Sequence, residues 1–329
     1  MMKSVLFWLL GAVLLTIASV AEAQQPGKIL RIGFLDLSTA AGIEVLLHAF
    51  RQELFKLGWI EGKNVTMEYR FADQKPERLP DLAAELVRLK LDLIVVAGTP
   101  SALAAKKATS TIPIVMANAG DPVSTGLVAS LARPGGNVTG LASLSPELNT
   151  KRLEILKDAV PSLGRVGLLR PSGQNISWDL QIKELMSAAM ALKLKLAEIE
   201  TSLDAKGFEG AFKTAKQMQI GAMMTITTRP FFAERKRIVE LAGQHRLPAI
   251  YFQKEFVDEG GLMAYGVDYD DLYRGAAVYV DKILKGAKPA DLPVQRATKF
   301  EFVINLKAAK LIGLTLSPDF LSRANKVIK

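Results

Sequence analysis

From residue 29 onward, short apolar runs alternate with amphipathic stretches along the chain. The first run, Ile29–Leu35, is short and bounded by polar residues, which predicts a strand. Apolar residues then recur every three or four positions from Ile43 to Leu57, which predicts a helix that ends at Gly58. The run Leu91–Ala97 is almost continuously apolar, as expected for a parallel strand buried on both faces. Strands that alternate with helices in this way indicate βα units around a parallel sheet.

The same alternation continues to the C-terminus and defines two series of elements. It predicts further strands at 65–71, 112–117, 141–143, 165–170, 195–199, 221–227, 248–252, 262–265 and 300–304, and helices at 77–90, from 99, and at 146–159, 179–192, 207–218, 230–245, 272–284 and 307–312. In the helix that begins near residue 99, we expect Thr99 to be the N-cap and Pro100 the first helical residue. A turn-rich segment at 132–140 separates the two series, so the boundary between two lobes is expected there.

The predicted fold is therefore α/β, with two similar lobes, each a parallel sheet flanked by helices, joined by a multi-crossover hinge. After a signal peptide at 1–23, the first lobe is expected to comprise 24–143 plus about 268–292. The second lobe is expected to comprise 144–267 plus about 293–329.

The N-terminal segment has the features of a signal peptide. Lys3 precedes an apolar run from Val5 to Val20, and the sequence Ala21–Ala23 then has the small-x-small pattern that signal peptidase cleaves. The run is shorter than the ~20 residues needed to span a bilayer core. We therefore expect an exported protein whose mature chain begins at Gln24, with an uncleaved anchor as the alternative.

Composition removes several classes of chemistry. The 329 residues contain no cysteine, so disulfides, thiolate catalysis, iron–sulfur clusters and a cysteine-linked lipid anchor are excluded. Only His48 and His245 offer imidazoles, so no metal site is expected. The net charge of +9 is spread along the chain without a zinc-finger spacing or a basic helix, and no nucleic-acid partner is predicted.

Catalytic motifs are absent as well. The sequence lacks a G-x-S-x-G elbow, an H-E-x-x-H helix and both glycine-rich phosphate signatures, so no enzyme activity and no cofactor are predicted. Asp121 with Asp268, or Asp270 with Asp271, are candidates for a carboxylate pair that hydrolyses a substrate. Capping of helices and turns is the favoured interpretation of these aspartates.

Polar residues follow several of the apolar runs, which is where open α/β sheets bind ligands. These strand ends are 35–38, 98–101, 118–121, 170–173, 225–229 and 266–268, and Trp178, Phe231, Tyr251, Phe252 and Tyr265 lie in or near them. The predicted ligand-binding residues are Ser38, Thr99, Ser101, Asp121, Ser172, Thr228, Tyr251 and Asp268. Tyr251 is expected to stack on an aromatic or apolar ligand, Thr99 and Ser101 to hold a carboxylate, and Asp121 or Asp268 to pair with an ammonium.

Several segments resemble one family, the exported substrate-binding proteins of bacterial ABC transporters, of the tryptophan/tyrosine type. The resemblance covers essentially the whole mature chain. It rests on segments 57–64, 112–115, 121–123, 130–140, 246–251, 260–266 and 285–293, which include Leu57-Gly58-Trp59-Ile60-Glu61-Gly62 and Ala132-Arg133-Pro134-Gly135-Gly136-Asn137. It implies a fold similar to the type I periplasmic binding proteins, with three crossovers and a ligand between the lobes.

The resemblance also implies a function. A small molecule, with an aromatic amino acid or related carboxylate as the inherited expectation, would be captured between the lobes by a periplasmic monomer and delivered to a membrane permease with its cytoplasmic ATPase. The main alternative is an exported module that senses the same ligand and signals to a receptor. A repressor's ligand-binding half and a hydrolase are weaker alternatives, because no helix-turn-helix and no catalytic motif is present.

Overall fold

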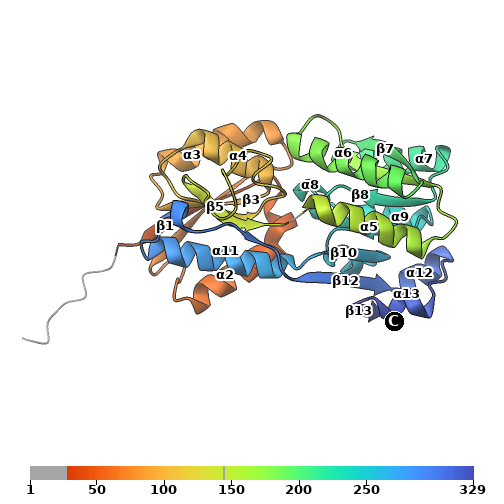
Figure 1. The fold of residues 1–329 in the computed structure, drawn as a ribbon. Coiled ribbons are helices and arrows are strands. Elements are labelled where there is room, and N and C mark those ends of the chain that lie inside the picture. Colours follow the sequence, from red (N-terminus) through yellow and green to blue (C-terminus); the bar gives the residue numbers. More distant parts are fainter. Residues whose placement is uncertain (1–27, 144) are drawn as a thin grey trace, which may run out of the picture.

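The computed structural model describes residues 28–143 and 145–329, which form two α/β lobes side by side (Figure 1). The expected signal peptide at 1–23 and the expected start of the mature chain at Gln24 lie outside the described residues. Each lobe has one sheet with helices packed on its faces, which confirms the predicted fold class.

Among the described residues, the first lobe has a six-stranded sheet in the order β11-β5-β4-β3-β1-β2, with every strand pair parallel. Its elements are β1 (Leu30–Asp36), α2 (Ala40–Lys56), β2 (Val65–Phe71), η1 (Pro76–Arg78), α3 (Leu79–Arg88), β3 (Leu93–Ala97), α4 (Thr99–Ala108), β4 (Ile114–Asn118), β5 (Val138–Ala142), α11 (Tyr269–Leu284), η2 (Pro289–Asp291) and β11 (Gln295–Arg296).

The second lobe has a seven-stranded sheet in the order β13-β12-β10-β9-β8-β6-β7, in which only β10 and β12 pair antiparallel among the described strands. Its elements are α5 (Ser145–Ala159), β6 (Arg165–Pro171), α6 (Ile176–Ala191), β7 (Lys195–Thr201), α7 (Ala205–Gln217), β8 (Ala222–Thr225), α8 (Arg229–Ala233), α9 (Arg235–Gln244), β9 (Ala249–Tyr251), α10 (Glu255–Asp258), β10 (Met263–Val267), β12 (Phe300–Asn305), α12 (Leu306–Ile312), α13 (Pro318–Ser322) and β13 (Lys326–Ile328).

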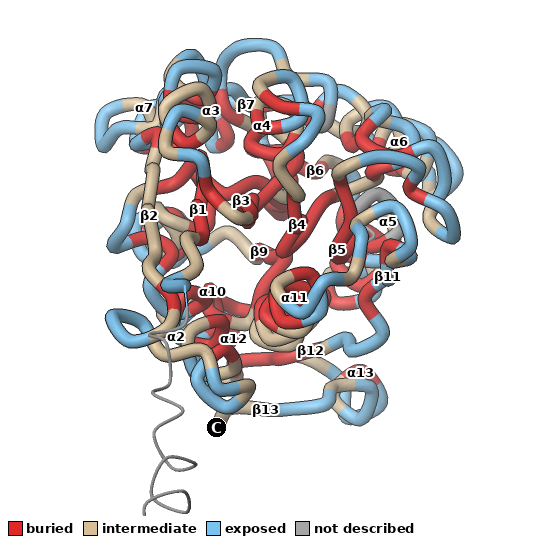
Figure 2. Tube along the Cα trace, turned by 90° about the vertical axis from the view of Figure 1, so that its left-hand side faces the viewer, coloured by how far each residue is buried: buried red, intermediate tan, exposed pale blue. Residues whose placement is uncertain are grey.

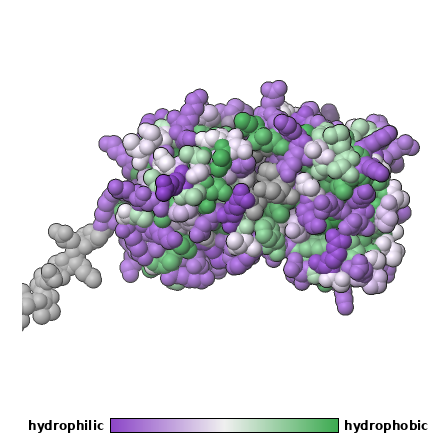
Figure 3. All heavy atoms as spheres, in the orientation of Figure 1, coloured by the Kyte–Doolittle hydropathy of each residue, from purple (hydrophilic) through white to green (hydrophobic). Residues whose placement is uncertain are grey.

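The apolar runs of the sequence become the central strands. Every residue of β3 and β4 is buried, because helices cover both faces of the sheet, and Figure 2 shows buried residues concentrated on these strands. Helix α11 buries residues at three- and four-residue spacing, and that face packs on α2 and β4. The outer surface is mixed: in Figure 3 hydrophilic residues cover much of both lobes, with smaller hydrophobic patches between them.

The chain passes between the two sheets after β5, after β10 and after β11. The sequence prediction ended the first lobe near residue 292, whereas Gln295 and Arg296 still pair with Leu141 and Ala142 of the first sheet. A strand of two exposed residues has no apolar pattern of its own, so only its pairing partner reveals it. Within the described chain, no helix is both long and apolar enough to cross a bilayer.

Candidate functional site

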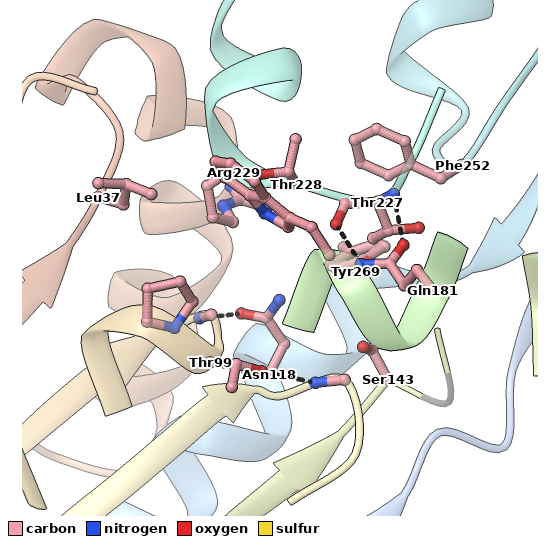
Figure 4. Close-up of a pocket in the computed structure, with 14 residues that line it drawn as sticks. Leu37, Thr99, Asn118, Ser143, Gln181, Thr227, Thr228, Arg229, Phe252 and Tyr269 are labelled. Atoms are coloured by element: carbon pink, nitrogen blue, oxygen red, sulfur yellow. Dashed lines mark hydrogen bonds between the residues drawn. The ribbon is translucent and has the colours of Figure 1, made fainter. Parts of the chain in front are cut away.

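A small cavity of about 40 Å³ lies between the two lobes. The first lobe lines it with Leu37, Gly98, Thr99, Pro100, Asn118, Gly120, Ser143 and Tyr269, and the second with Trp178, Gln181, Thr227, Thr228, Arg229 and Phe252. Most of these residues follow the carboxyl ends of parallel strands, where the backbone leaves the sheet. Figure 4 shows Thr99 and Asn118 on one side of the cavity and Thr228 and Arg229 facing them from the other.

Hydrogen bonds between strand ends hold the wall of the first lobe. Asn118 accepts from the Gly98 N–H through its backbone oxygen at 3.0 Å and through Oδ1 at 3.2 Å. The Thr99 hydroxyl oxygen accepts from the Gly120 N–H at 3.2 Å. Ser143 donates to the Ala119 carbonyl from its N–H at 2.7 Å and from its hydroxyl at 3.1 Å. The loops after β3, β4 and β5 therefore form one connected edge.

The role of Thr99 differs from the sequence prediction, which made it the N-cap of the helix. The N-cap of α4 is Gly98, at φ +82°, and Thr99 is the first helical residue. The Thr99 hydroxyl therefore does not cap the helix, and it accepts a hydrogen bond from the Gly120 N–H after the neighbouring strand instead. The reason is the turn after β3, which places Gly98 at positive φ, so the helix begins one residue earlier than the sequence pattern suggested.

The wall of the second lobe is held by a network around Thr227. The Gln181 side chain accepts from the Thr227 N–H at 2.8 Å and donates to the Thr227 carbonyl at 3.0 Å (Figure 4). Arg152 donates to the Thr227 hydroxyl at 2.9 Å and to the Tyr265 carbonyl at 3.0 Å. Asn149 completes the network by donating to Gln181 at 3.0 Å and accepting from Arg152. Burial lowers the pKa of Arg152 to about 10, so its guanidinium is charged at neutral pH.

Arg229 brings a buried positive charge to the cavity. Arg229 is only 5% exposed, and its guanidinium stacks over the Phe232 ring, with 4.7 Å between Cζ and the ring centre. The nearest carboxylate is that of Asp36 in the first lobe, with 3.8 Å between Arg229 Nε and Asp36 Oδ2. Within the described chain, Nε, Nη1 and Nη2 of Arg229 have no hydrogen-bond partner. The pair is therefore an ion pair without a hydrogen bond, and the guanidinium keeps unused donors beside the cavity.

Asp36 is fully buried at the end of β1, where its Oδ1 accepts from the Ser38 N–H at 2.8 Å. Burial raises the pKa of Asp36 to about 6, while the charge of Arg229 and the backbone N–H groups act in the opposite direction. Desolvation is the larger effect because no donor reaches Oδ2 from the described residues. The carboxyl group therefore loses its proton near pH 6, about one pH unit below neutrality.

Further contacts join the lobes beside the cavity. Gln74 donates to the Glu234 carboxylate at 3.0 Å across the two lobes. Gly42 of α2 lies against α8, and a Cβ atom at this position would stand 2.6 Å from Cβ of Ala233. The lobes thus touch, and the 40 Å³ between them is far below the ~300–1,000 Å³ of ordinary ligand pockets. Entry of a ligand as large as an amino acid requires the lobes to separate.

The structure brings two of the predicted binding residues, Thr99 and Thr228, to the cavity. Ser38 and Ser101 are buried in the first lobe but do not line it. Ser172 is exposed at the end of β6, away from the cavity.

Both predicted aspartates act as caps, in agreement with the favoured interpretation. Asp121 accepts from the N–H groups of Val123 and Ser124 at 3.1 and 3.0 Å. Asp268 is the N-cap of α11 and accepts from the Asp271 N–H at 2.9 Å. Neither aspartate lines the cavity.

Tyr251, expected to stack on the ligand, lies in the core of the second lobe. Its ring stacks on Phe256 with 4.7 Å between centroids, and it borders a separate apolar crevice between α9 and α12. Phe252, the next residue, lines the cavity instead. Successive residues of an extended segment point to opposite sides. A prediction that is wrong by one position therefore assigns a core residue to the cavity.

Several cavity residues were not among the predicted ones. Asn118, Gly120, Thr227 and Arg229 lie in strand ends that the sequence did single out, so position along the chain was the available signal. Gln181 lies within α6, more than a turn from the nearest strand end, and no sequence signal marks it.

Comparisons with known proteins place the chain among transport proteins. The sequence model of the ABC transporter substrate binding protein family matches residues 41–328. A tyrosine-binding protein of Clostridioides difficile is 27% identical over 290 residues, which cover 88% of this chain and 82% of the relative.

Two solved structures are similar over the full fold. A conserved domain protein from Vibrio cholerae superposes with a TM-score of 0.83 and 28% identity, over 91% of this chain and 100% of its own. An ABC domain in complex with L-Trp from Streptococcus pneumonia superposes with a TM-score of 0.81 and 25% identity, over 91% of this chain and 99% of its own.

Proposed function

Because the chain belongs to the ABC transporter substrate-binding protein family, we propose that it captures an aromatic amino acid between its lobes and delivers it to an importer. The observation that carries this proposal is the composition of the interlobe cavity. Three aromatic side chains, Trp178, Phe252 and Tyr269, stand beside hydroxyl and amide groups from both lobes. Aromatic rings provide stacking surface, and the polar strand ends orient the polar part of the ligand. The relatives named for tyrosine and bound to L-Trp support the same ligand class.

Binding is coupled to the position of the lobes. A ligand held by one lobe gains the contacts of the other only when the lobes close, so its affinity for the closed form exceeds its affinity for the open form. The three crossovers after β5, β10 and β11 supply the hinge for this movement. A permease that recognises the closed pair of lobes would then receive the ligand, and a cytoplasmic ATPase would drive its release.

The first experiment is calorimetric titration of mature protein that has been unfolded and refolded to remove carried-over ligand. Tyrosine, tryptophan and phenylalanine are expected to bind with micromolar or tighter dissociation constants, and branched-chain amino acids at least tenfold more weakly. No heat with any aromatic amino acid would overturn the proposed ligand class and leave the fold intact.

A matched pair of variants tests the place of binding. Tyr269→Phe removes a hydroxyl of the cavity and is expected to weaken tyrosine binding about fivefold, since one hydrogen bond is worth ~1 kcal/mol. Tyr251→Phe removes a buried hydroxyl in the core of the second lobe and is expected to leave affinity unchanged. The opposite ranking would place the ligand near Tyr251, as the sequence first suggested.

Delivery and export have their own tests. Deletion of the gene is expected to abolish uptake of the labelled ligand, whereas uptake that persists while a transcriptional response is lost would indicate a sensor. The periplasmic fraction is expected to contain the protein as a monomer, and its measured mass is expected to match a chain that begins at Gln24.

A further inference from the structure

The cavity has an uneven distribution of charge. Among the described residues that line it, Arg229 alone carries a charged side chain, and none carries a carboxylate. The predicted partners for an ammonium group, Asp121 and Asp268, cap a turn and a helix outside the cavity. A free amino acid carries one positive and one negative group, and among the described residues that line the cavity only the negative group meets an opposite charge.

The guanidinium of Arg229 is suited to a carboxylate. It has five N–H donors in a planar fork, which bind a carboxylate through two parallel hydrogen bonds. Its nitrogens have no hydrogen-bond partner among the described residues, although the residue is 5% exposed. Asp36 balances part of the charge from 3.8 Å but accepts no hydrogen bond from it. Donors of a buried cation that are left without acceptors are unfavourable, and an anionic ligand would satisfy them.

We propose that the cavity selects its aromatic ligand by the carboxylate, which binds Arg229 of the second lobe, and that the α-ammonium group is dispensable. This inference rests on the proposed function and narrows its ligand class to aromatic carboxylic acids, with or without an amino group. An ammonium in the cavity meets neutral oxygens of Thr99 and Ser143 and the repulsion of a guanidinium. A carboxylate meets Arg229, which alone is cationic among the described residues of the lining.

Arg229 also connects recognition with closure. It reaches from α8 of the second lobe toward Asp36 and Gly98 of the first, where a Cβ atom on Gly98 would lie 3.3 Å from Arg229 Cγ. A ligand carboxylate that is held against the first lobe therefore contacts the Arg229 guanidinium only when the two lobes approach each other. The charge contact is part of the free energy that favours the closed form.

The test compares three ligands with the same ring. L-tyrosine, 3-(4-hydroxyphenyl)propanoate and tyramine share the phenol but carry both charged groups, the carboxylate alone and the ammonium alone. Calorimetry is expected to give the propanoate a dissociation constant within about tenfold of that of tyrosine, and tyramine one about 100-fold weaker. The tryptophan series, with indole-3-propanoate and tryptamine, is expected to give the same order.

The outcomes separate the two proposals. Tyramine binding as tightly as the propanoate, or a propanoate that fails where tyrosine binds, would overturn the role of the carboxylate and leave the proposed function standing. No binding by any of the six compounds would overturn the proposed function and this inference together.

Variants assign the effect to Arg229. Arg229→Gln is expected to weaken binding of the propanoate about 100-fold and not to weaken binding of tyramine, because it removes a repulsion between the guanidinium and the ammonium. Arg235→Gln is the matched control, because Arg235 stacks on the same Phe232 ring at 4.9 Å but pairs with Glu259 outside the cavity. Equal losses in the two variants would show that only the stacking around Phe232 matters.

A double variant guards against misfolding. Arg229→Gln leaves Asp36 buried without its cation, so Asp36→Asn with Arg229→Met removes both charges together. This variant is expected to show a cooperative thermal transition and the same loss of propanoate binding. A folded double variant that binds the propanoate as the wild type does would overturn the assignment.

Discussion

Asp36 and Arg229 stand at the end of β1 and the start of α8, and each is buried in the contact between the lobes. Their charges lie 3.8 Å apart without a hydrogen bond, so the attraction does not fully offset the desolvation of the carboxylate. The pKa of Asp36 is therefore raised to about 6, because desolvation outweighs the attraction of Arg229. The same imbalance leaves Arg229 with donors for a ligand and makes the stability of the protein sensitive to pH.

The pH dependence has a definite sign. An aspartate in the unfolded chain titrates near 3.8, while folded Asp36 titrates near 6, so the folded state binds the proton more tightly. As pH rises from about 4 to 6 the unfolded chain loses this proton first, and the free energy of unfolding falls by up to ~3 kcal/mol from this group alone. Below pH 4 the contribution is fully present. Asp36→Asn is expected to lack this slope, as measured by urea unfolding at each pH.

Asp121→Asn is the control for this prediction. Hydrogen bonds from Ser124 and Val123 outweigh desolvation and hold the pKa of Asp121 below its usual value, so it titrates below the pH 4–6 window. The variant is therefore expected to keep the slope of the wild type between pH 4 and 6. Equal slopes in the wild type and Asp36→Asn would contradict the assignment to Asp36.

At the scale of elements, the cavity is built where strands of both sheets end and helices begin. The turn from β3 into α4 is an example, because Gly98 adopts φ +82° and presents its N–H to Asn118 while Thr99 bonds Gly120. With φ +82° and ψ 153°, Gly98 has a backbone conformation that is almost restricted to glycine and costs another residue ~1–3 kcal/mol. The turn therefore needs glycine both for its backbone and for the approach of Arg229.

Gly98→Ala is expected to lower the free energy of unfolding by ~1–3 kcal/mol and to weaken ligand binding about tenfold. The added Cβ would stand 3.3 Å from Arg229 Cγ, so the cation of the cavity has to shift. Gly286→Ala is the matched control, since Gly286 has φ +101° but no atom within 4 Å of an added Cβ. It is expected to show a similar loss of stability in urea unfolding with unchanged affinity in calorimetry.

At the scale of the whole molecule, the described chain forms two lobes that are joined by three crossovers and touch where α2 packs against α8. A ligand as large as an amino acid enters only if this contact opens, because the cavity measures about 40 Å³. Closure thus depends on a surface where side chains are small. Gly42 and Ala233 provide it, with 2.6 Å between a Cβ built on Gly42 and Cβ of Ala233.

Gly42→Leu is expected to hold the lobes apart. Leucine is a better helix former than glycine, so helix propensity does not oppose the change, and the Ser38 hydroxyl, 2.9 Å from an added Cβ, has to turn away. Small-angle scattering at saturating ligand is expected to show a larger radius of gyration than the wild type, and affinity is expected to fall at least tenfold.

Gly210→Ala in α7, where an added Cβ meets no atom within 4 Å, is the control and is expected to leave both values unchanged. A ligand-bound Gly42→Leu protein as compact as the wild type would show that the contact between α2 and α8 does not limit closure.

How much of this was visible in the sequence depends on the element. Strand β2 was predicted at its observed bounds, and α2, β3 and α11 within a few residues of theirs, because their apolar periodicity is strong. The predicted helix at 230–245 is divided into α8 and α9, and α10, β11, α13 and β13 were not predicted. The four elements that were not predicted have two to five residues each, too few for a hydrophobic period to be recognised.

The amino-acid sequence by itself determined the α/β class, the two lobes and the edge of the sheets at which polar residues collect. These follow from local periodicity and from the rule that parallel strands end at a common edge. Only the tertiary structure decided which of those residues face the cavity. Tyr251 and Phe252 differ by one position and point to opposite sides, and Thr99 lines the cavity while Ser101 does not. Arg229 matters through its approach to a residue almost two hundred positions away, because contacts between lobes depend on how the two sheets are set against each other.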